Sequence, residues 1–165
     1  MLCFTPARAG LFVAITLLAA CGGERPASTG APAASAPGAA APANPGGLTD
    51  YELKNGIGPI TTEVVLGAPD HELAEKGEKL FTTKCSACHK MNEKYVGPPL
   101  GGIVQRVGPT FVMNMALNPE GMYTRHPEVK KLLGEYMTQM PNQQISPEDA
   151  RAIVEYLRTQ PASGS

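Results

Sequence analysis

The sequence predicts a small all-α domain over residues 70–161. Apolar residues recur at the spacing of one helical face in four separate segments of this region. Capping and helix-breaking residues stand at the ends of these segments. Aromatic residues make up only 5% of the 165 residues and tryptophan is absent, so a further group is expected to fill the centre of the domain.

The motif CSACH at residues 85–89 indicates what that group is. Two cysteines separated by two residues and followed at once by histidine are typical of a c-type haem attachment site. The thiols of Cys85 and Cys88 each add across one vinyl group of the haem, and His89 then binds the iron from one face. The predicted cofactor is therefore one covalently bound haem c.

The same spacing also occurs in redox-active cysteine pairs and in one half of a zinc site. Only Cys85 and Cys88 fall in the part of the chain that is expected to fold, so a disulfide framework lacks further partners. A four-ligand zinc site would need His71 and His126, and neither has ligand spacing to another residue. A thioredoxin-like pair predicts a βαβ pattern, which is absent, and leaves His89 unexplained.

The N-terminal residues predict export and a membrane anchor. Residues 1–20 carry one early positive charge and then an apolar run that is too short to span a bilayer but suits a signal peptide. The sequence LAAC at residues 18–21 resembles the lipobox of bacterial lipoproteins, which implies lipidation of Cys21 and a periplasmic location, with the inner or outer membrane left open. The alternative is ordinary cleavage, which would leave Cys21 as a spare thiol.

Two further segments precede the helical domain. Residues 21–47 are almost entirely Ala, Pro, Gly and Ser, which cannot bury a core, and we expect a semi-extended tether. Residues 48–69 are expected to form an extended arm that wraps the domain, with short strand-like pairing, and carry no assigned chemistry. The formal charge of −1 gives no electrostatic reason to expect nucleic acid as a partner, and we expect a monomer.

The helices of the domain are predicted in order from their caps and apolar positions. The first begins after Asp70, a plausible N-cap, and leads into the motif, with Gly77 and Phe81 on its apolar face. The glycine would allow another helix to approach closely. The later helices are expected over residues 109–118, 127–137 and 147–160, the last with Ser146 as its N-cap.

A low-spin electron carrier needs a second iron ligand, and methionine sulfur is the usual choice for a high potential. Met115 and Met137 lie on apolar helical faces, where core packing explains them. Met140 lies off that pattern in a loop before the last helix, held by Pro141, and is the predicted ligand. Met137 and His126 remain alternatives, and His126 is otherwise expected to be either a surface residue or an N-terminal helix residue ahead of Pro127.

In combination these motifs resemble the class I monohaem cytochromes c over roughly residues 70–160. The resemblance rests on the order helix, CSACH, GPPL at residues 97–100, helix, QMP at residues 139–141 and closing helix. It implies the small cytochrome c fold of three to five helices around one covalently bound haem. It also implies that the first and last helices cross where Gly77 and Phe81 meet Tyr156 and Leu157.

The resemblance also assigns roles around the haem. It implies that the Pro98 carbonyl accepts a hydrogen bond from the free ring nitrogen of His89, which orients the ligand and raises its basicity. Leu100 would pack on the haem face. The tryptophan that many members place near a haem propionate is missing, and Arg106 or Asn114 is the candidate substitute.

The implied function is single-electron transfer between Fe(III) and Fe(II), not enzymatic catalysis. The alternative is a haem enzyme or gas sensor with an open iron face. The cluster of Lys84, Lys90 and Lys94 near the haem edge is a candidate to dock an acidic redox partner, or is ordinary solvated surface. Residues 56–59 and 140–143 resemble cytochromes encoded beside nitrous oxide reductases, which implies that enzyme, or another terminal reductase or oxidase, as partner.

Overall fold

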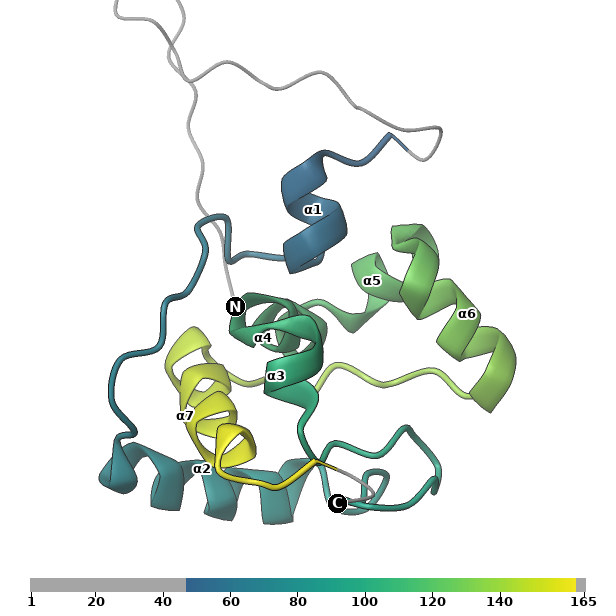
Figure 1. The fold of residues 1–165 in the computed structure, drawn as a ribbon. Helices are drawn as coiled ribbons and strands as arrows, with labels where there is room; N and C mark the ends of the chain where they lie inside the picture. Colours follow the sequence, from purple (N-terminus) through teal and green to yellow (C-terminus); the bar gives the residue numbers. More distant parts are fainter. Residues whose placement is uncertain (1–46, 163–165) are drawn as a thin grey trace, which may run out of the picture. The chain divides into compact units, whose positions relative to one another are not determined.

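The computed structural model describes residues 47–162, which form seven α-helices and no β-strand (Figure 1). The all-α prediction is therefore confirmed for this part of the chain. The predictions for the signal peptide, for Cys21 and for nearly all of the tether lie outside the described residues. None of the described helices is long and apolar enough to cross a membrane.

The longest two helices, α2 (His71–Lys84) and α7 (Pro147–Arg158), pack directly against each other. Asp70 accepts a hydrogen bond from the Leu73 N–H at 3.0 Å, and Ser146 caps α7 in the same way, so both predicted caps are confirmed. A Cβ atom at Gly77 would collide with the carbonyl oxygen of Ala152, so only glycine permits this close approach.

One turn after Gly77 on α2, an aromatic pair adds to the contact between α2 and α7. The rings of Phe81 and Tyr156 have centroids 5.4 Å apart at an interplanar angle of 45°. Tilted aromatic pairs at this distance contribute about 0.5–1.5 kcal/mol beyond their buried area. The predicted meeting of Gly77 and Phe81 with Tyr156 is thus present in the structure.

Four shorter helices lie between α2 and α7. They are α3 (Ile103–Val107), α4 (Pro109–Leu117), α5 (Pro119–Arg125) and α6 (Pro127–Tyr136). Figure 1 shows α5 and α6 lying away from the crossing of α2 and α7, on the other side of α4. A first buried cluster joins α2, α3, α4 and α7, and a second joins the arm to α5 and α6.

The arm over residues 48–69 is not extended throughout. Its first part forms α1 (Asp50–Asn55), closed by a capping box in which Thr49 and Glu52 bind each other's backbone N–H groups. The remainder has neither helix nor strand and runs beside α4 and α7, where Val64 donates to the Thr110 hydroxyl at 2.8 Å. The predicted strand-like pairing is therefore wrong for the described residues. The described residues form seven helices where three to five were predicted, because the short helices α1, α3 and α5 were not predicted.

Candidate functional site

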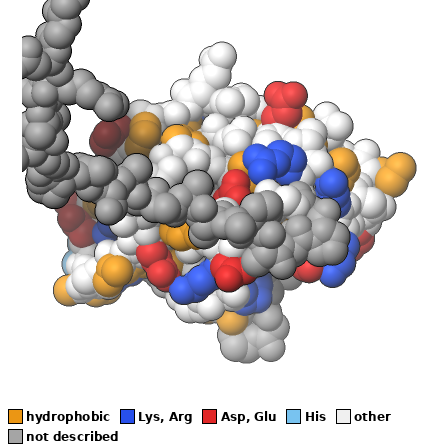
Figure 2. All heavy atoms as spheres, turned by 90° about the horizontal axis from the view of Figure 1, so that it is seen from above, with side chains coloured by type: hydrophobic (Ala, Val, Ile, Leu, Met, Phe, Trp, Pro, Cys, Tyr) orange, Lys and Arg blue, Asp and Glu red, His pale blue; other side chains and the backbone are white. Residues whose placement is uncertain are grey.

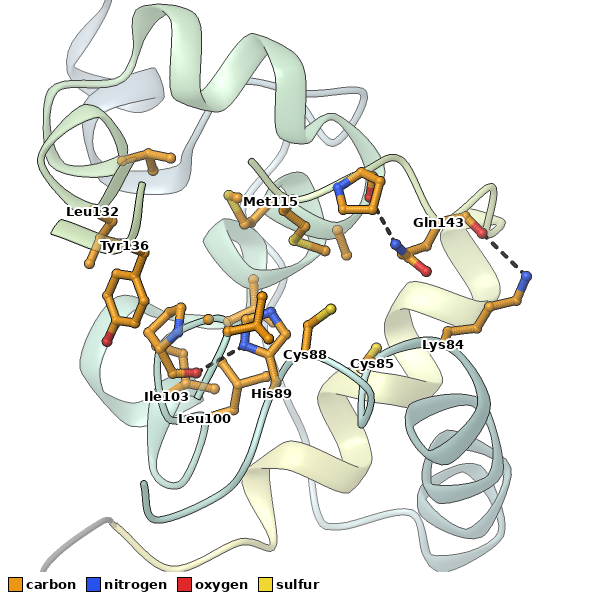
Figure 3. A pocket seen from close by; sticks show the side chains of 18 of the residues that line it. Lys84, Cys85, Cys88, His89, Leu100, Ile103, Met115, Leu132, Tyr136 and Gln143 are labelled. Atoms are coloured by element: carbon orange, nitrogen blue, oxygen red, sulfur yellow. Dashed lines mark hydrogen bonds between the residues drawn. The ribbon is translucent and has the colours of Figure 1, made fainter. Parts of the chain in front are cut away.

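An apolar cavity lies between the CSACH segment on one side and helices α4 to α6 on the other (Figure 3). Its empty space is about 1320 Å³, part of which is open to solvent. Residues from α2, from the long loop after it, from the five later helices and from the loop before α7 line it. The apolar ones include Phe81, Leu100, Ile103, Phe111, Met115, Leu133, Ile145 and Leu157. Such a concave, largely apolar site with a few polar groups is typical of cofactor binding.

The CSACH segment places both thiols and the imidazole on one wall of this cavity. Helix α2 ends at Lys84, and the N–H groups of Cys88 and His89 then both bond to the Cys85 carbonyl, at 3.0 and 2.9 Å. This tight turn brings the Cys85, Cys88 and His89 side chains to one side, as Figure 3 shows. Burial, with a smaller contribution from Cys88, raises the pKa of Cys85 to about 11, so its thiol is protonated at neutral pH.

His89 is oriented by a backbone carbonyl. Its Nδ1–H donates to the Pro98 carbonyl oxygen at 2.9 Å, which leaves the other ring nitrogen for a ligand. Burial lowers the pKa of His89, and the bond to Pro98 opposes that effect only in part. The ring is thereby held neutral, the form that binds metal. Gly97 keeps the backbone close, because a Cβ there would lie 2.5 Å from the His89 Cε1 atom.

Met140 lines the same cavity from the loop between α6 and α7. Neither alternative ligand is among the residues that line it. Met137 ends α6 with φ of 51° and is 83% exposed. His126 is only 1% exposed, and its Nε2–H donates to the Leu53 carbonyl at 3.0 Å. Of the two expectations for His126, the surface residue is therefore wrong and the N-terminal helix residue is confirmed, because His126 is the N-cap of α6.

Met115 is a cavity residue that sequence reasoning assigned only to core packing. It projects from α4 into the space across from the CSACH segment in Figure 3. Phe111, one turn earlier on the same helix, also lines the cavity. Their four-residue spacing marks one helical face, a signal that was visible but does not distinguish a core face from a cofactor face.

Neither candidate substitute for the missing tryptophan lines the cavity. Leu100 does, but Arg106 is exposed and donates hydrogen bonds to the carbonyls of Gly101 and Pro99. Asn114 is fully buried and bonds to the arm. A contact between Arg106 and a haem propionate therefore stays a prediction, and in this structure the guanidinium braces the turn after Pro99.

The three lysines near the motif differ in their surroundings. The Lys84 ammonium lies 3.4 Å from the Gln143 carbonyl, while Lys90 lies over the Tyr95 ring at 5.0 Å. Lys94 pairs with Glu135 at 2.9 Å, so its charge is locally balanced. On the face seen in Figure 2, acidic and basic side chains are interspersed and form no broad area of one sign.

The donor set of the cavity fits a c-type haem. The two cysteines are free thiols, the neutral imidazole faces the same space, and the opposite wall is apolar with methionine sulfur from Met140 or Met115 within it. A planar, largely hydrophobic macrocycle with an iron centre suits these groups. Within residues 47–162 no group of three or more His, Cys, Asp or Glu side chains could hold a metal ion by itself.

Comparison with known proteins gives the same result. The profile of the family described as Cytochrome c matches residues 74–161. A cytochrome c from Rhodothermus marinus is 47% identical, with a TM-score of 0.62, and the match covers 66% of this chain and 94% of that chain. An engineered cytochrome c from the same organism, bound to a carbene intermediate, is 46% identical, with a TM-score of 0.60 and coverage of 66% and 95%. No match was found among curated proteins.

The predicted cytochrome c fold is therefore confirmed, and so is the covalently bound haem c that it implies. The family also makes this an electron-carrying haem protein. The chain belongs to the cytochrome c family.

Proposed function

We propose that this protein is an exported, lipid-anchored electron carrier whose haem iron lies between His89 and Met140. It is proposed to act by electron transfer alone and not as an enzyme. The observation that supports this most directly is that His89 and Met140 line one apolar cavity although they come from segments far apart in the sequence. Methionine as the second ligand favours a high potential.

The bound haem supplies the one-electron couple Fe(III)/Fe(II). The protein side chains hold and tune it. Cys85 and Cys88 attach it, and the Pro98 carbonyl fixes the ring of His89 and raises its basicity. Apolar residues such as Phe111 and Leu133 exclude water, which disfavours the more highly charged ferric state and raises the potential.

The alternative of an open iron face has one structural observation in its favour. A second cavity, with about 540 Å³ of empty space against about 1320 Å³ for the first, adjoins the first and shares Tyr123, Gln139, Met140 and Pro141 with it. If Met140 moved toward this space, the second face of the iron would become accessible to a small ligand. A haem enzyme or gas sensor would therefore use the same cavity with Met140 displaced.

Replacing Met140 separates these functions. Met140→Ala is expected to keep the covalent haem, to abolish the weak far-red sulfur-to-iron band of the ferric protein, and to lower the midpoint potential by on the order of 0.1 V. Optical spectra and a redox titration measure both effects. Met115→Ala, at the other methionine of the cavity, is the matched control and should keep the band.

Two outcomes would contradict this assignment. If Met115→Ala loses the band while Met140→Ala keeps it, the sulfur ligand is Met115. If the unsubstituted ferric protein is already five-coordinate and high-spin, Met140 does not close the iron and the open-face alternative holds.

The proposed partner is a terminal reductase or oxidase, with nitrous oxide reductase the first candidate, and the proposed anchor is lipidated Cys21. We expect the reduced protein to be oxidised on mixing with purified nitrous oxide reductase, which stopped-flow absorbance at the haem bands measures. If no terminal reductase or oxidase oxidises it, the proposed partner class is wrong.

Cys21→Ser tests the proposed anchor. The substitution should move the exported protein from the membrane fraction to the soluble fraction, and retention of this variant in the membrane fraction would exclude lipidation of Cys21 as the anchor.

A further inference from the structure

Buried side chains from α4, α5 and the start of α6 form hydrogen bonds with the backbone of the arm between residues 53 and 60. Asn114 of α4 makes several of these bonds. Its Nδ2 donates to the carbonyls of Asn55 and Ile60, both at 3.0 Å, and its Oδ1 accepts the Ile60 N–H at 3.0 Å. Asn114 is fully buried, so these bonds have no competition from water and fix the arm against α4.

Two further side chains bind the same stretch of the arm from α5 and α6. The sulfur of Met122 accepts the Ile57 N–H at 3.0 Å, and the Nε2–H of His126 donates to the Leu53 carbonyl at 3.0 Å. Met122 is fully buried and His126 is 1% exposed. Helices α4, α5 and α6 are therefore each tied to one short segment of the arm.

The same three helices form the cavity wall across from His89. Four residues of this wall stand within three positions of a side chain that binds the arm, namely Phe111, Met115, Tyr123 and Val129. Leu132, Leu133 and Tyr136 lie further along α6 and belong to the wall through that helix. The Phe111 ring also packs edge-on against the buried ring of His126, with centroids 5.1 Å apart. If the arm were displaced, the parts of α4, α5 and α6 that line the cavity would therefore also lose a support.

The loop that carries Met140 depends on where α6 ends. It is irregular from Met137 to Ile145, and it contains Met137 and Gln144, the two non-glycine residues with positive φ in the described part of the chain. Its side-chain bonds are largely internal, such as that from Gln143 to the Pro141 carbonyl at 2.9 Å. The end of the loop is held separately, because Lys84 donates to the Gln143 carbonyl at 3.4 Å and Ile145 packs against the first cluster. Met140 lies nearer the start, three residues after Met137, so its position depends mainly on where α6 ends.

We propose that the arm is a positioning element for the second iron ligand. By tying α4, α5 and α6 together, it holds the wall and the end of α6 where Met140 can reach the iron, and so makes dissociation of Met140 less favourable. This inference rests on the proposed ligation by Met140. It differs from a purely structural role for the arm, because weakening the arm should expose the iron before it unfolds the domain.

A pair of methionine substitutions tests the inference. Met122→Leu keeps the buried volume but leaves the Ile57 N–H without an acceptor, whereas Met113→Leu makes the same change at a buried core position in the other cluster. The readout is binding of exogenous imidazole to the ferric holoprotein, which requires Met140 to leave the iron. We expect Met122→Leu to bind imidazole about tenfold more tightly, because an unpaired buried N–H is costly in the closed state. Met113→Leu should stay within about twofold of the unsubstituted protein.

A second pair uses His126 and controls for lost stability. His126→Leu should also increase imidazole affinity. In His126→Gln the side-chain Nε2 can occupy the place of the histidine donor, so its imidazole affinity should return to that of the unsubstituted protein. The free energy of unfolding is measured for all variants. The inference is overturned if imidazole affinity is unchanged in Met122→Leu and His126→Leu, or if Met113→Leu raises it equally for an equal loss of stability. Absence of the far-red band in the unsubstituted protein would instead refute ligation by Met140 itself.

Discussion

A protein that carries Cys85→Ser together with Cys88→Ser is expected to be exported without covalent haem and to lack a stable fold. The thioethers need both thiols, and serine forms no equivalent bond to the vinyl groups. The cavity has about 1320 Å³ of empty space, part of it open to solvent, lined by residues of all six helices from α2 to α7. Without the haem, these apolar side chains would contact water or collapse on one another, at a cost of about 25 cal/mol for each Å² left exposed.

Mass spectrometry and thermal unfolding followed by circular dichroism measure the two effects. The double variant should lack the haem mass and should unfold without a cooperative transition. Ser86→Ala, inside the same motif, is the control: its hydroxyl bonds only to the Thr82 carbonyl at 2.6 Å, so haem attachment should persist. A cooperatively folding, haem-free double variant would show that the haem is not needed as the core.

Most of the helices followed from local signals in the sequence. Asp70 and Ser146 are N-caps as predicted, accepting from the N–H groups of Leu73 and Asp149, and the helices after them are long enough to repeat an apolar period. Helices α1, α3 and α5 have six, five and seven residues, which is too short for a period to be recognised. Asn118 illustrates the difficulty, because it ends α4 and its side chain also caps α5.

In the candidate site, the motif itself predicted Cys85, Cys88 and His89, and the family resemblance supplied the bond from His89 to the Pro98 carbonyl. His89 and Pro98 are nine residues apart, and a tight turn at Cys85 orients the ring. The support of the opposite wall was not predictable in this way. The bonds from Met122 and His126 to the arm join residues 65 and 73 positions apart, and no spacing in a single sequence indicates such pairs. The burial of His126 was missed for this reason.

Among the glycines that the structure describes, Gly77→Ala is expected to destabilise the domain most, because its added methyl group meets backbone at the shortest distance. Its Cβ would collide with the Ala152 carbonyl oxygen and approach the Tyr156 Cβ at 3.0 Å, and a backbone atom inside a helix has little freedom to move away. Helices α2 and α7 would have to separate, which would also disturb Phe81 and Leu157 on the cavity wall.

We therefore expect Gly77→Ala to lower the free energy of unfolding by about 2–4 kcal/mol, as overpacking at a rigid contact does. Gly134→Ala is the matched control, because Gly134 lies within α6 and nothing stands within 4 Å of its added Cβ. There the higher helix propensity of alanine should raise stability by up to about 1 kcal/mol. Guanidinium unfolding of the holoprotein measures both, since the covalent haem stays attached in the unfolded chain. Equal effects of the two substitutions would mean that the close crossing of α2 and α7 does not limit the stability of this fold.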